Sequence, residues 1–316
     1  MDAAVVTRFD QPPQFGQIDA PEPRSEHDLV VDVLAAGLHQ RVRSQAAGSH
    51  YTSTDHLPLV PGIDGVGRDT EGRLRYFLLP TTTMGSMAQQ TVIDARRSVI
   101  LPEDIDPVAL AAAMNPAMSS WVALRQRISF EPGQDVLILG ATGNSGQMAV
   151  RIAKLFGAGK IVAAGRDLEK LAQLPALGAT ETIRLGADDT ADRLAELAAD
   201  VDVVIDYVWG ENTVAAMTAM VPRRSDPGRQ LTWIEIGSVG GLTANIPSAA
   251  FRAVRLQLVG SGQGSITPSD YMAQLPALAT EIVSGSLRVD ASAVPLREVT
   301  AAWTADDANG RIVLVP

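Results

Sequence analysis

The sequence predicts an α/β protein that combines a doubly wound parallel sheet with a second, β-rich domain. Residues 1–118 hold short β-type runs separated by many Pro and Gly turn signals, which is typical of an all-β unit. From residue 119, apolar runs alternate with helix-length segments, which is the spacing of βαβ units. Residues 263–316 return to a mixed pattern. We therefore expect domains at 1–118 and 119–262, followed by a C-terminal segment, 263–316.

Each expected element rests on a short apolar run. In the β-rich part the expected strands are Ala3–Val6, Leu29–Gly37, Arg73–Leu79 and Thr91–Asp94, with turns at Pro12-Pro13, Pro61-Gly62 and Glu71-Gly72. An alanine-rich stretch, Val108–Met114, predicts a helix. The parallel sheet is expected from Asp135–Leu139, Lys160–Ala164, Glu181–Leu185, Val201–Tyr207, Leu231–Gly237 and Arg255–Ser261, and a last strand from Gly310–Pro316.

Composition excludes several classes of function. The chain has 316 residues, a formal net charge of −10 and 46% hydrophobic residues, so a large core is expected and disorder is not. The acidic balance argues against nucleic-acid or anionic-membrane partners. No run approaches the roughly 20 apolar residues of a spanning helix, and no secretory signal is visible. The absence of cysteine excludes disulfides and thiolate metal sites. We expect a soluble, cytoplasmic protein.

A glycine-rich turn carries the main chemical signal. It reads Gly140-Ala141-Thr142-Gly143-Asn144-Ser145-Gly146, after the apolar run Asp135–Leu139. A helical pattern follows, with Met148, Ile152 and Leu155 or Phe156 on one face. A pyrophosphate needs backbone N–H groups at the positive end of a helix, without side chains in its way. The context therefore predicts dinucleotide binding, although a purely structural βα turn would have the same pattern.

The residues after the second strand of the sheet predict which dinucleotide is bound. A fold that prefers NAD places Asp or Glu there to bind the ribose 2′-OH. Here the strand ends at Gly165 and Arg166 follows, and a guanidinium can bind a 2′-phosphate with two hydrogen bonds. Asp167 is expected to cap the next helix, and Lys170 adds a second positive charge. We expect NADPH; the alternative for Arg166 and Lys170 is a solvated helix face.

Several segments, in their order and spacing, match one family. They are Val60–Gly67, Glu131–Ile138, the glycine turn, Leu177–Ala179, Ile236–Ser238 and Gly310–Leu314. Together they resemble the medium-chain dehydrogenase/reductase superfamily, specifically its zinc-free quinone oxidoreductase-like branch. The resemblance covers nearly the whole chain. It implies an N-terminal GroES-like catalytic domain, a Rossmann domain that binds the cofactor, and a C-terminal return to the first domain.

The resemblance also implies further cofactor contacts. Ser119 corresponds to a Thr or Ser that faces the nicotinamide in this branch. Gly237 and Ser238 follow the fifth strand of the sheet, where the cofactor crevice is expected to open. Ser261 and Gly262 begin a loop, continuing to Gly264, that the family places near the nicotinamide. The alternative for this loop is a flexible linker.

The zinc site of other members of the superfamily is not expected here. Those relatives carry a Cys near the substrate loop and a His-Glu pair in the proline-glycine turn. In this chain the turn reads Pro61-Gly62-Ile63-Asp64-Gly65, and cysteine is absent. Ile63 has no ligating atom, and Asp64 is expected to be a hydrogen-bonding turn residue. We therefore expect no metal.

Without a metal to polarise a carbonyl, the expected chemistry is hydride donation to an acceptor that delocalises the charge. Quinones and α,β-unsaturated carbonyls are such acceptors. Tyr51, in the loop that resembles the substrate loop of the family, is the first candidate for the proton donor. His39, at a position where the branch often has Asn, is the second; His50 is also considered. Trp209 packs either over the nicotinamide or substrate, or in the core.

Two other functions remain open. One is a zinc-free ketone or aldehyde reductase. The other is a non-catalytic NADPH-binding sensor or structural protein. The expected partner is a small-molecule acceptor, which is a quinone, an enone or a ketone. A homodimer is expected because Arg255–Ser261 resembles the edge strand that pairs across a two-fold axis in the family.

Overall fold

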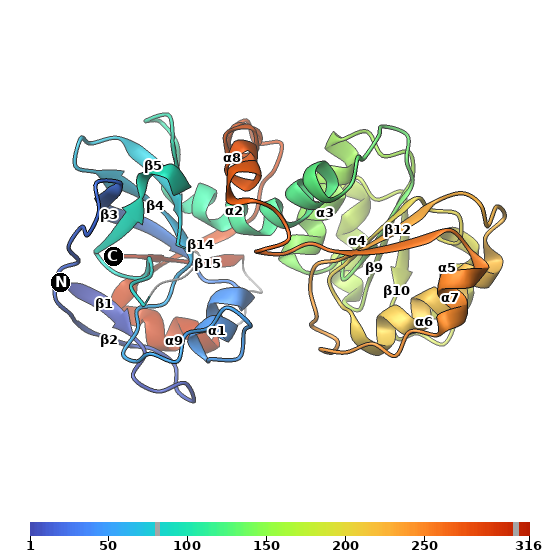
Figure 1. Cartoon of the computed structure of the whole chain (residues 1–316), viewed down its shortest axis with the longest axis horizontal. Helices are drawn as coiled ribbons and strands as arrows, with labels where there is room; N and C mark the ends of the chain where they lie inside the picture. The colour runs from blue at the N-terminus through green and yellow to red at the C-terminus, as the bar shows by residue number, and fades with distance from the viewer. Residues whose placement is uncertain (80–82, 306–309) are drawn as a thin grey trace. The chain divides into compact units, whose positions relative to one another are not determined.

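The computed structural model describes residues 1–79, 83–305 and 310–316. They form two units (Figure 1). The β-rich unit consists of Met1–Asn115 and Met272–Pro316, and the parallel-sheet unit consists of Pro116–Tyr271. Helices α2 (Pro107–Val122) and α8 (Pro268–Val283) each include a boundary between the two.

The β-rich unit is built on a mixed sheet that the C-terminal segment completes: β14 and β15 pair in parallel, and the other pairs are antiparallel. Its strands run in the order β14-β15-β3-β4-β5-β7, and β6 also pairs with β3. The strands are β3 (Asp28–Gly37), β4 (Asp64–Asp69), β5 (Leu74–Leu78), β6 (Gln90–Asp94), β7 (Ser98–Ile100), β14 (Ala291–Pro295) and β15 (Arg311–Val315). A separate hairpin joins β1 (Asp2–Val5) to β2 (Gln14–Gln17), and the short helices are α1 (Gln40–Ala46) and α9 (Val299–Thr304). The core between them includes Leu38, Val42, Met87, Val299 and Leu314.

The parallel-sheet unit confirms the expected doubly wound sheet. Six parallel strands run in the order β10-β9-β8-β11-β12-β13. They are β8 (Val136–Leu139), β9 (Ile161–Gly165), β10 (Glu181–Arg184), β11 (Val203–Asp206), β12 (Leu231–Glu235) and β13 (Leu256–Gly260). The helices are α3 (Asn144–Leu155), α4 (Leu168–Leu177), α5 (Thr190–Leu197), α6 (Gly210–Met220) and α7 (Ser248–Ala253). Each of the six predicted strands is found, with ends displaced by at most two residues.

The helices cover both faces of this sheet. Figure 1 shows α3 on one side and α5 and α6 on the other. Leu194 of α5 and Met217 of α6 pack in one apolar layer with Val204 and Trp233. On α3 the buried side includes Met148 and Ile152, as the helical pattern predicts. Leu155 is exposed, whereas the ring of Phe156 packs against Trp121 at 4.9 Å between centroids.

Some strands of the β-rich unit are not anticipated by the sequence. β4 begins at Asp64, where the sequence predicts a turn, because the glycines of this segment serve close strand packing. A Cβ atom on Gly67 would overlap the carbonyl oxygen of Asp32 on β3. The other unanticipated strands, β2, β7 and β14, have three to five residues and hardly any fully buried side chains. Their apolar pattern is therefore too weak to read.

Candidate functional site

The glycine turn connects β8 to α3 in a close-packed bend. The N–H groups of Gly140 and Ala141 donate to the carbonyl of Ala164 on β9, at 2.9 and 2.8 Å. Gly140 has φ +86°, a conformation that favours glycine. A Cβ on Gly146 would overlap the Gly140 carbonyl oxygen and Ala141 Cα. Both glycines are therefore required for α3 to start so close to the sheet.

The first turn of α3 is open toward solvent and ligands. Its N-cap residue is Gly143, which offers no capping side chain. Within the described residues, the N–H groups of Asn144 and Ser145 have no backbone acceptor, as is usual at a helix start. A Cβ on Gly143 would meet only the Gly140 oxygen, at 3.6 Å, so the space above this residue is free. A phosphate group fits this site, because the amides are uncapped, the helix dipole favours negative charge and the space at Gly143 is free.

The residues at the end of β9, the strand next to β8, lie against the glycine turn. The side chain of Thr142 lies against Gly165, where a Cβ would come within 2.5 Å of Thr142 Cγ2. Arg166 is exposed and has no hydrogen-bond or ion-pair partner among the described residues. Asp167 caps α4 by accepting from Lys170 N at 3.1 Å, as predicted. The Lys170 side chain is half-buried.

A hydroxyl pair lies at the point where the strand order reverses. The chain runs from β8 to β9 on one side and later to β11 on the other, so the carboxyl ends of β8 and β11 flank the switch point where ligands bind in such sheets. Tyr207 follows β11, and its hydroxyl lies 2.8 Å from Ser119 Oγ. Burial raises the pKa of Tyr207 to about 12. Ser119 is predicted from the sequence as a site residue, whereas Tyr207 is not.

Asp206 holds the chain next to Tyr207 in place. Its buried carboxylate accepts from the backbone N–H groups of Val208 and Trp209, both at 2.9 Å. It also accepts from Thr213 Oγ1 at 2.5 Å and from Trp233 Nε1 at 2.9 Å. Trp209 is half-buried with φ +53°. A buried carboxylate with four donors is a rigid anchor for the end of β11.

The loops after β12 and β13 are also held in place. Gly237 N donates to Asp206 O at 3.2 Å, and Ser238 follows it with its carbonyl accepting from Gly241 N at 3.2 Å. Ser261 N donates to Glu235 O at 2.8 Å, and Gly262 N donates to Ser265 Oγ at 2.9 Å. The loop that could have been a linker is therefore an ordered turn.

Two charged residues near these loops are absent from the sequence analysis. Arg127 donates from Nε to Gly260 O at 2.8 Å and from Nη1 to Ser265 O at 3.1 Å, which ties the loop after β13 to the end of the π-helical segment Ala123–Arg127. Glu235 ends β12 half-buried, and burial together with the negative charge of Asp206 raises the pKa of its carboxyl. Glu235 and Asp206 could have been noticed as acidic residues at strand ends; Arg127 carried no local signal.

His39 belongs to a buried polar network of the β-rich unit. It is the N-cap residue of α1, and its Nε2 lies 3.2 Å from Asp64 Oδ1. Tyr76 donates to Asp64 Oδ2 at 2.7 Å, so the expected hydrogen-bonding role of Asp64 is confirmed at the start of a strand. Burial lowers the pKa of His39, although the hydrogen bond to Asp64 opposes this. The other ring nitrogen, Nδ1, is buried without a partner in the described part of the chain.

Tyr51 lies in the loop between α1 and β4. Its side chain is 73% exposed, and its ring contacts that of His50 at 4.3 Å between centroids. His50 Nδ1 in turn lies 2.8 Å from Thr52 Oγ1. Tyr51 is therefore accessible to solvent, whereas His39 is buried.

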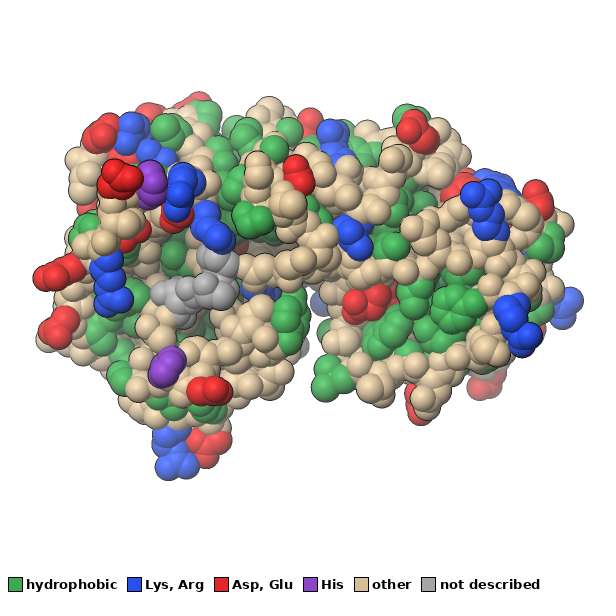
Figure 2. All heavy atoms as spheres, in the orientation of Figure 1, with side chains coloured by type: hydrophobic (Ala, Val, Ile, Leu, Met, Phe, Trp, Pro, Cys, Tyr) green, Lys and Arg blue, Asp and Glu red, His purple; other side chains and the backbone are tan. Residues whose placement is uncertain are grey.

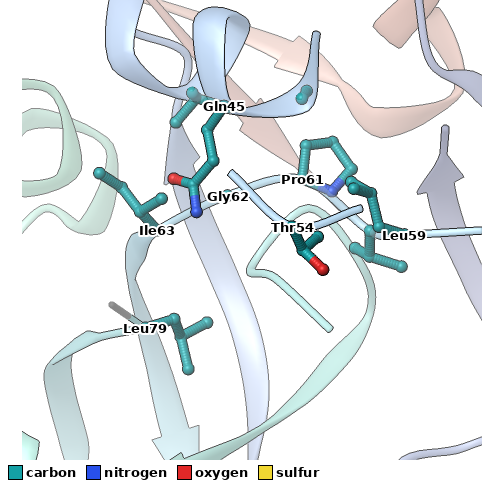
Figure 3. Close-up of a pocket in the computed structure, with 10 residues that line it drawn as sticks. Gln45, Thr54, Leu59, Pro61, Gly62, Ile63 and Leu79 are labelled. Atoms are coloured by element: carbon teal, nitrogen blue, oxygen red, sulfur yellow. The ribbon is translucent and has the colours of Figure 1, made fainter. Parts of the chain in front are cut away.

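Two hollows lie within the separate units. Figure 3 shows one in the β-rich unit, where Gln45, Pro61, Gly62, Ile63 and Leu79 surround a cavity of about 20 Å³. This volume holds about one water molecule, which is too little for a substrate. The other, of about 470 Å³, is an open polar groove of the parallel-sheet unit; its lining includes Arg127, Val203, Thr232 and Gln257. Val203, Thr232 and Gln257 belong to the amino-terminal halves of their strands, at the opposite edge from the glycine turn.

On the face in Figure 2, acidic and basic side chains are interspersed. Within residues 1–79, 83–305 and 310–316, no helix is long and apolar enough to cross a membrane. In the same ranges, no group of three or more His, Asp and Glu side chains is placed to hold a metal ion.

Comparison with known proteins points to one family. Residues 146–278 match the family model described as zinc-binding dehydrogenase. A probable NADPH-dependent quinone reductase of Emericella nidulans is 29% identical, with both chains covered completely. The 2-methylene-furan-3-one reductase of Solanum lycopersicum is 28% identical over 72% of this chain and 58% of its own. The quinone oxidoreductase of Thermus thermophilus, also solved with NADPH, superposes with a TM-score of 0.81 and 27% identity over both full chains.

The segment that matches the family model does not fit a zinc site. All four histidines, His27, His39, His50 and His56, precede residue 146, and the chain has no cysteine. Only carboxylates remain there as charged ligands, whereas zinc in proteins is bound mainly by thiolates and imidazoles. The glycine turn, by contrast, fits a dinucleotide through its open amides and the free space at Gly143.

Proposed function

The chain belongs to the medium-chain dehydrogenase/reductase superfamily, in its quinone oxidoreductase-like branch, and we propose that it reduces quinones or α,β-unsaturated carbonyls with NADPH and without a metal ion. It is an oxidoreductase that uses a nicotinamide cofactor and a small-molecule acceptor. One observation carries the proposal: the uncapped start of α3 after a side-chain-poor turn, next to the switch point of the sheet.

The choice of NADPH rests on the residues after β9. Because Asp167 is engaged as the cap of α4, no carboxylate is held ready at Gly165 to bind the ribose hydroxyls. The exposed guanidinium of Arg166 can bind a 2′-phosphate, and Lys170 adds positive charge one turn along. The Emericella relative is named NADPH-dependent and the Thermus relative is solved in complex with NADPH, which is consistent with this preference.

The chain itself would bind and orient the reactants. NADPH, when bound, supplies the hydride. The open amides of Asn144 and Ser145, in the turn Ala141–Gly146, would bind the pyrophosphate, and Ser119 with the loops at Gly237, Ser238, Ser261 and Gly262 would surround the nicotinamide end. Each of these segments is held by the hydrogen bonds described above, which favours a preorganised site.

We compare two candidates for the proton donor, Tyr51 and His39, which differ in burial and in their ability to donate a proton. Tyr51 is 73% exposed, which favours proton exchange between its phenol and water. His39 donates Nε2–H to Asp64, which leaves Nδ1 as an acceptor unless the imidazole is protonated. Burial disfavours that protonation, so we favour Tyr51.

The test is a binding and turnover experiment. Intrinsic tryptophan fluorescence is titrated with NADPH and NADH, and NADPH oxidation is then followed with quinones, enones and simple ketones. We expect saturable binding with preference for NADPH, and turnover with quinones or enones. Turnover with ketones alone would indicate a carbonyl reductase, and tight binding without any turnover a sensor. Absence of saturable NADPH binding at millimolar concentration would refute the proposal.

We also propose a homodimer formed through β13. This strand is the last of the sheet order, so one of its edges has no partner strand in the described residues. Phe251, in the preceding helix α7, is 44% exposed. An unpaired edge beside an exposed aromatic side chain is suited to isologous pairing. Light scattering that detects only monomer would contradict this.

A further inference from the structure

Tyr207 and Ser119 form a hydroxyl pair whose hydrogen bonds can be rearranged. Ser119 Oγ lies 2.9 Å from Pro116 O and 2.8 Å from Tyr207 Oη. A serine hydroxyl has one hydrogen to donate. When Ser119 donates to Pro116 O, the Tyr207 hydroxyl donates to Ser119. When Ser119 turns to Tyr207, the phenol hydrogen becomes available to a third group.

This rearrangement leaves the helix intact. Pro116 and Ser119 both lie inside α2, where a carbonyl already accepts the backbone N–H four residues along the chain. Pro116 O therefore still accepts this backbone hydrogen bond when the Ser119 hydroxyl turns away. The Tyr207 hydroxyl can therefore be redirected while the Pro116 carbonyl keeps a hydrogen bond. A buried carbonyl without any hydrogen bond would cost free energy.

Neighbouring glycines bring the backbone of Tyr207 close to the cofactor turn. A Cβ on Gly140 would come within 3.2 Å of Tyr207 Cβ, and a Cβ on Gly237 within 3.0 Å of Tyr207 O. Tyr207 N donates to Leu139 O at 3.1 Å, and the preceding residue is the fully hydrogen-bonded Asp206. Both hydroxyl-bearing residues are partly exposed. The phenol is thus fixed at the carboxyl edge of the sheet, between the two loops expected to contact the cofactor.

We propose that the Tyr207 hydroxyl is a catalytic hydrogen-bond donor to the carbonyl oxygen of the acceptor, with Ser119 as the residue that positions it. This inference rests on the proposed function, because it requires an acceptor carbonyl beside the nicotinamide. The ligand class is a quinone or enone oxygen that becomes negatively charged.

The reaction requires only NADPH, the acceptor and a proton source. A hydride, which is one proton with two electrons, passes from NADPH to the acceptor, so that NADP⁺ is left and the acceptor becomes a phenolate or an enolate. The Tyr207 hydroxyl donates a hydrogen bond to the oxygen that gains this charge, without losing its proton. Water or the Tyr51 hydroxyl then supplies the proton that completes the quinol or the saturated carbonyl. A phenol whose pKa is about 12 remains protonated at neutral pH, as such a donor must.

The test uses Tyr207→Phe and Ser119→Ala. For Tyr207→Phe we expect kcat to fall about 100-fold, at the lower end of the loss typical for one donor to a developing oxyanion. The dissociation constant of NADPH should change less than about 2-fold. Ser119→Ala should give a smaller loss. Tyr271→Phe, which removes the hydroxyl of the other tyrosine in this unit, is the control expected to retain activity.

A second measurement does not depend on turnover. The visible absorbance of 4-nitrophenolate, bound to the enzyme with NADP⁺, reports hydrogen bonds to its phenolate oxygen. We expect wild-type protein to bind it with a shifted band, and Tyr207→Phe to lose the shift and bind about 10-fold more weakly. The proposal is overturned by an unshifted wild-type band, by equal effects of Tyr207→Phe and Tyr271→Phe, or by a parallel loss of NADPH binding. A Tyr207-dependent shift in a protein that reduces no acceptor would refute the proposed function alone.

Discussion

The Asp167 carboxylate accepts a hydrogen bond of 3.1 Å from the backbone N–H of Lys170. The first acidic side chain after β9 is therefore used to cap α4, in the position where a dinucleotide fold often places a carboxylate for ribose. Arg166, between Gly165 and this cap, is left exposed at the same strand end. Discrimination between the two cofactors should therefore depend on one guanidinium.

Replacement of that guanidinium should affect NADPH alone. Arg166→Ala is expected to cost NADPH binding about 1.5–3 kcal/mol, roughly 10- to 150-fold, as for hydrogen bonds to charged groups. NADH binding should be nearly unchanged because it lacks the 2′-phosphate. Fluorescence titration with both cofactors gives the comparison. Arg223→Ala, at another exposed arginine of the unit, is the matched control. Equal losses for NADPH and NADH would contradict the assignment.

Two glycines of the turn should respond differently to the same substitution. Gly146→Ala places a methyl group against the Gly140 carbonyl, so we expect about 1–3 kcal/mol of lost stability, as for overpacked cores. Gly143→Ala meets only one atom at 3.6 Å, and its φ of −78° suits alanine. It should lose less stability than Gly146→Ala, although alanine is a poorer N-cap residue than glycine, and it should bind NADPH more weakly because the methyl group occupies the approach of the phosphate. Thermal denaturation and NADPH titration separate the two effects; normal NADPH binding by Gly143→Ala would place the pyrophosphate elsewhere.

The sequence predicts best where apolar periodicity and local motifs coincide. The four inner strands of the parallel sheet, β9, β8, β11 and β12, are buried runs, and the bend at Gly140 and the cap at Asp167 follow from local chemistry. β4 is different, because Gly65 and Gly67 have the composition of a turn. Their lack of side chains instead allows close contact with the neighbouring strands, including Asp32 O. That contact joins distant segments and is invisible in one sequence.

Contacts between distant segments are also the part of the candidate site that one sequence does not predict. Ser119 is selected through a family pattern, but its partner Tyr207 is 88 residues away in the chain. Likewise, Arg127 acts on the carbonyls of Gly260 and Ser265, to which no sequence spacing connects it. Residues whose role depends on pairing between distant segments become apparent only when the strand order is known.

Removal of metal ions should leave activity unchanged. The chain lacks cysteine, and Ile63 stands where zinc-using relatives have a histidine. We therefore expect NADPH oxidation to be the same before and after dialysis against EDTA, within the error of the assay. Added Zn²⁺ should not stimulate it. Loss of activity on chelation, with recovery on addition of zinc, would show that carboxylates and histidines assemble a functional site.

Stability should depend on pH through His39. Burial lowers the pKa of this imidazole below its ordinary value of 6.5, so the unfolded chain binds more protons than the folded chain between the two pKa values. The free energy of unfolding then rises with pH in that window and falls as the pH is lowered from about 6.5. His39→Gln keeps a donor for Asp64 without titrating, so its melting temperature should vary less between pH 5 and 7. Burial, followed by the charge of Arg41, also lowers the pKa of His50, so the profile of His50→Gln must be measured in parallel. If His39→Gln and wild type lose stability equally on acidification, the buried His39–Asp64 pair does not control this dependence.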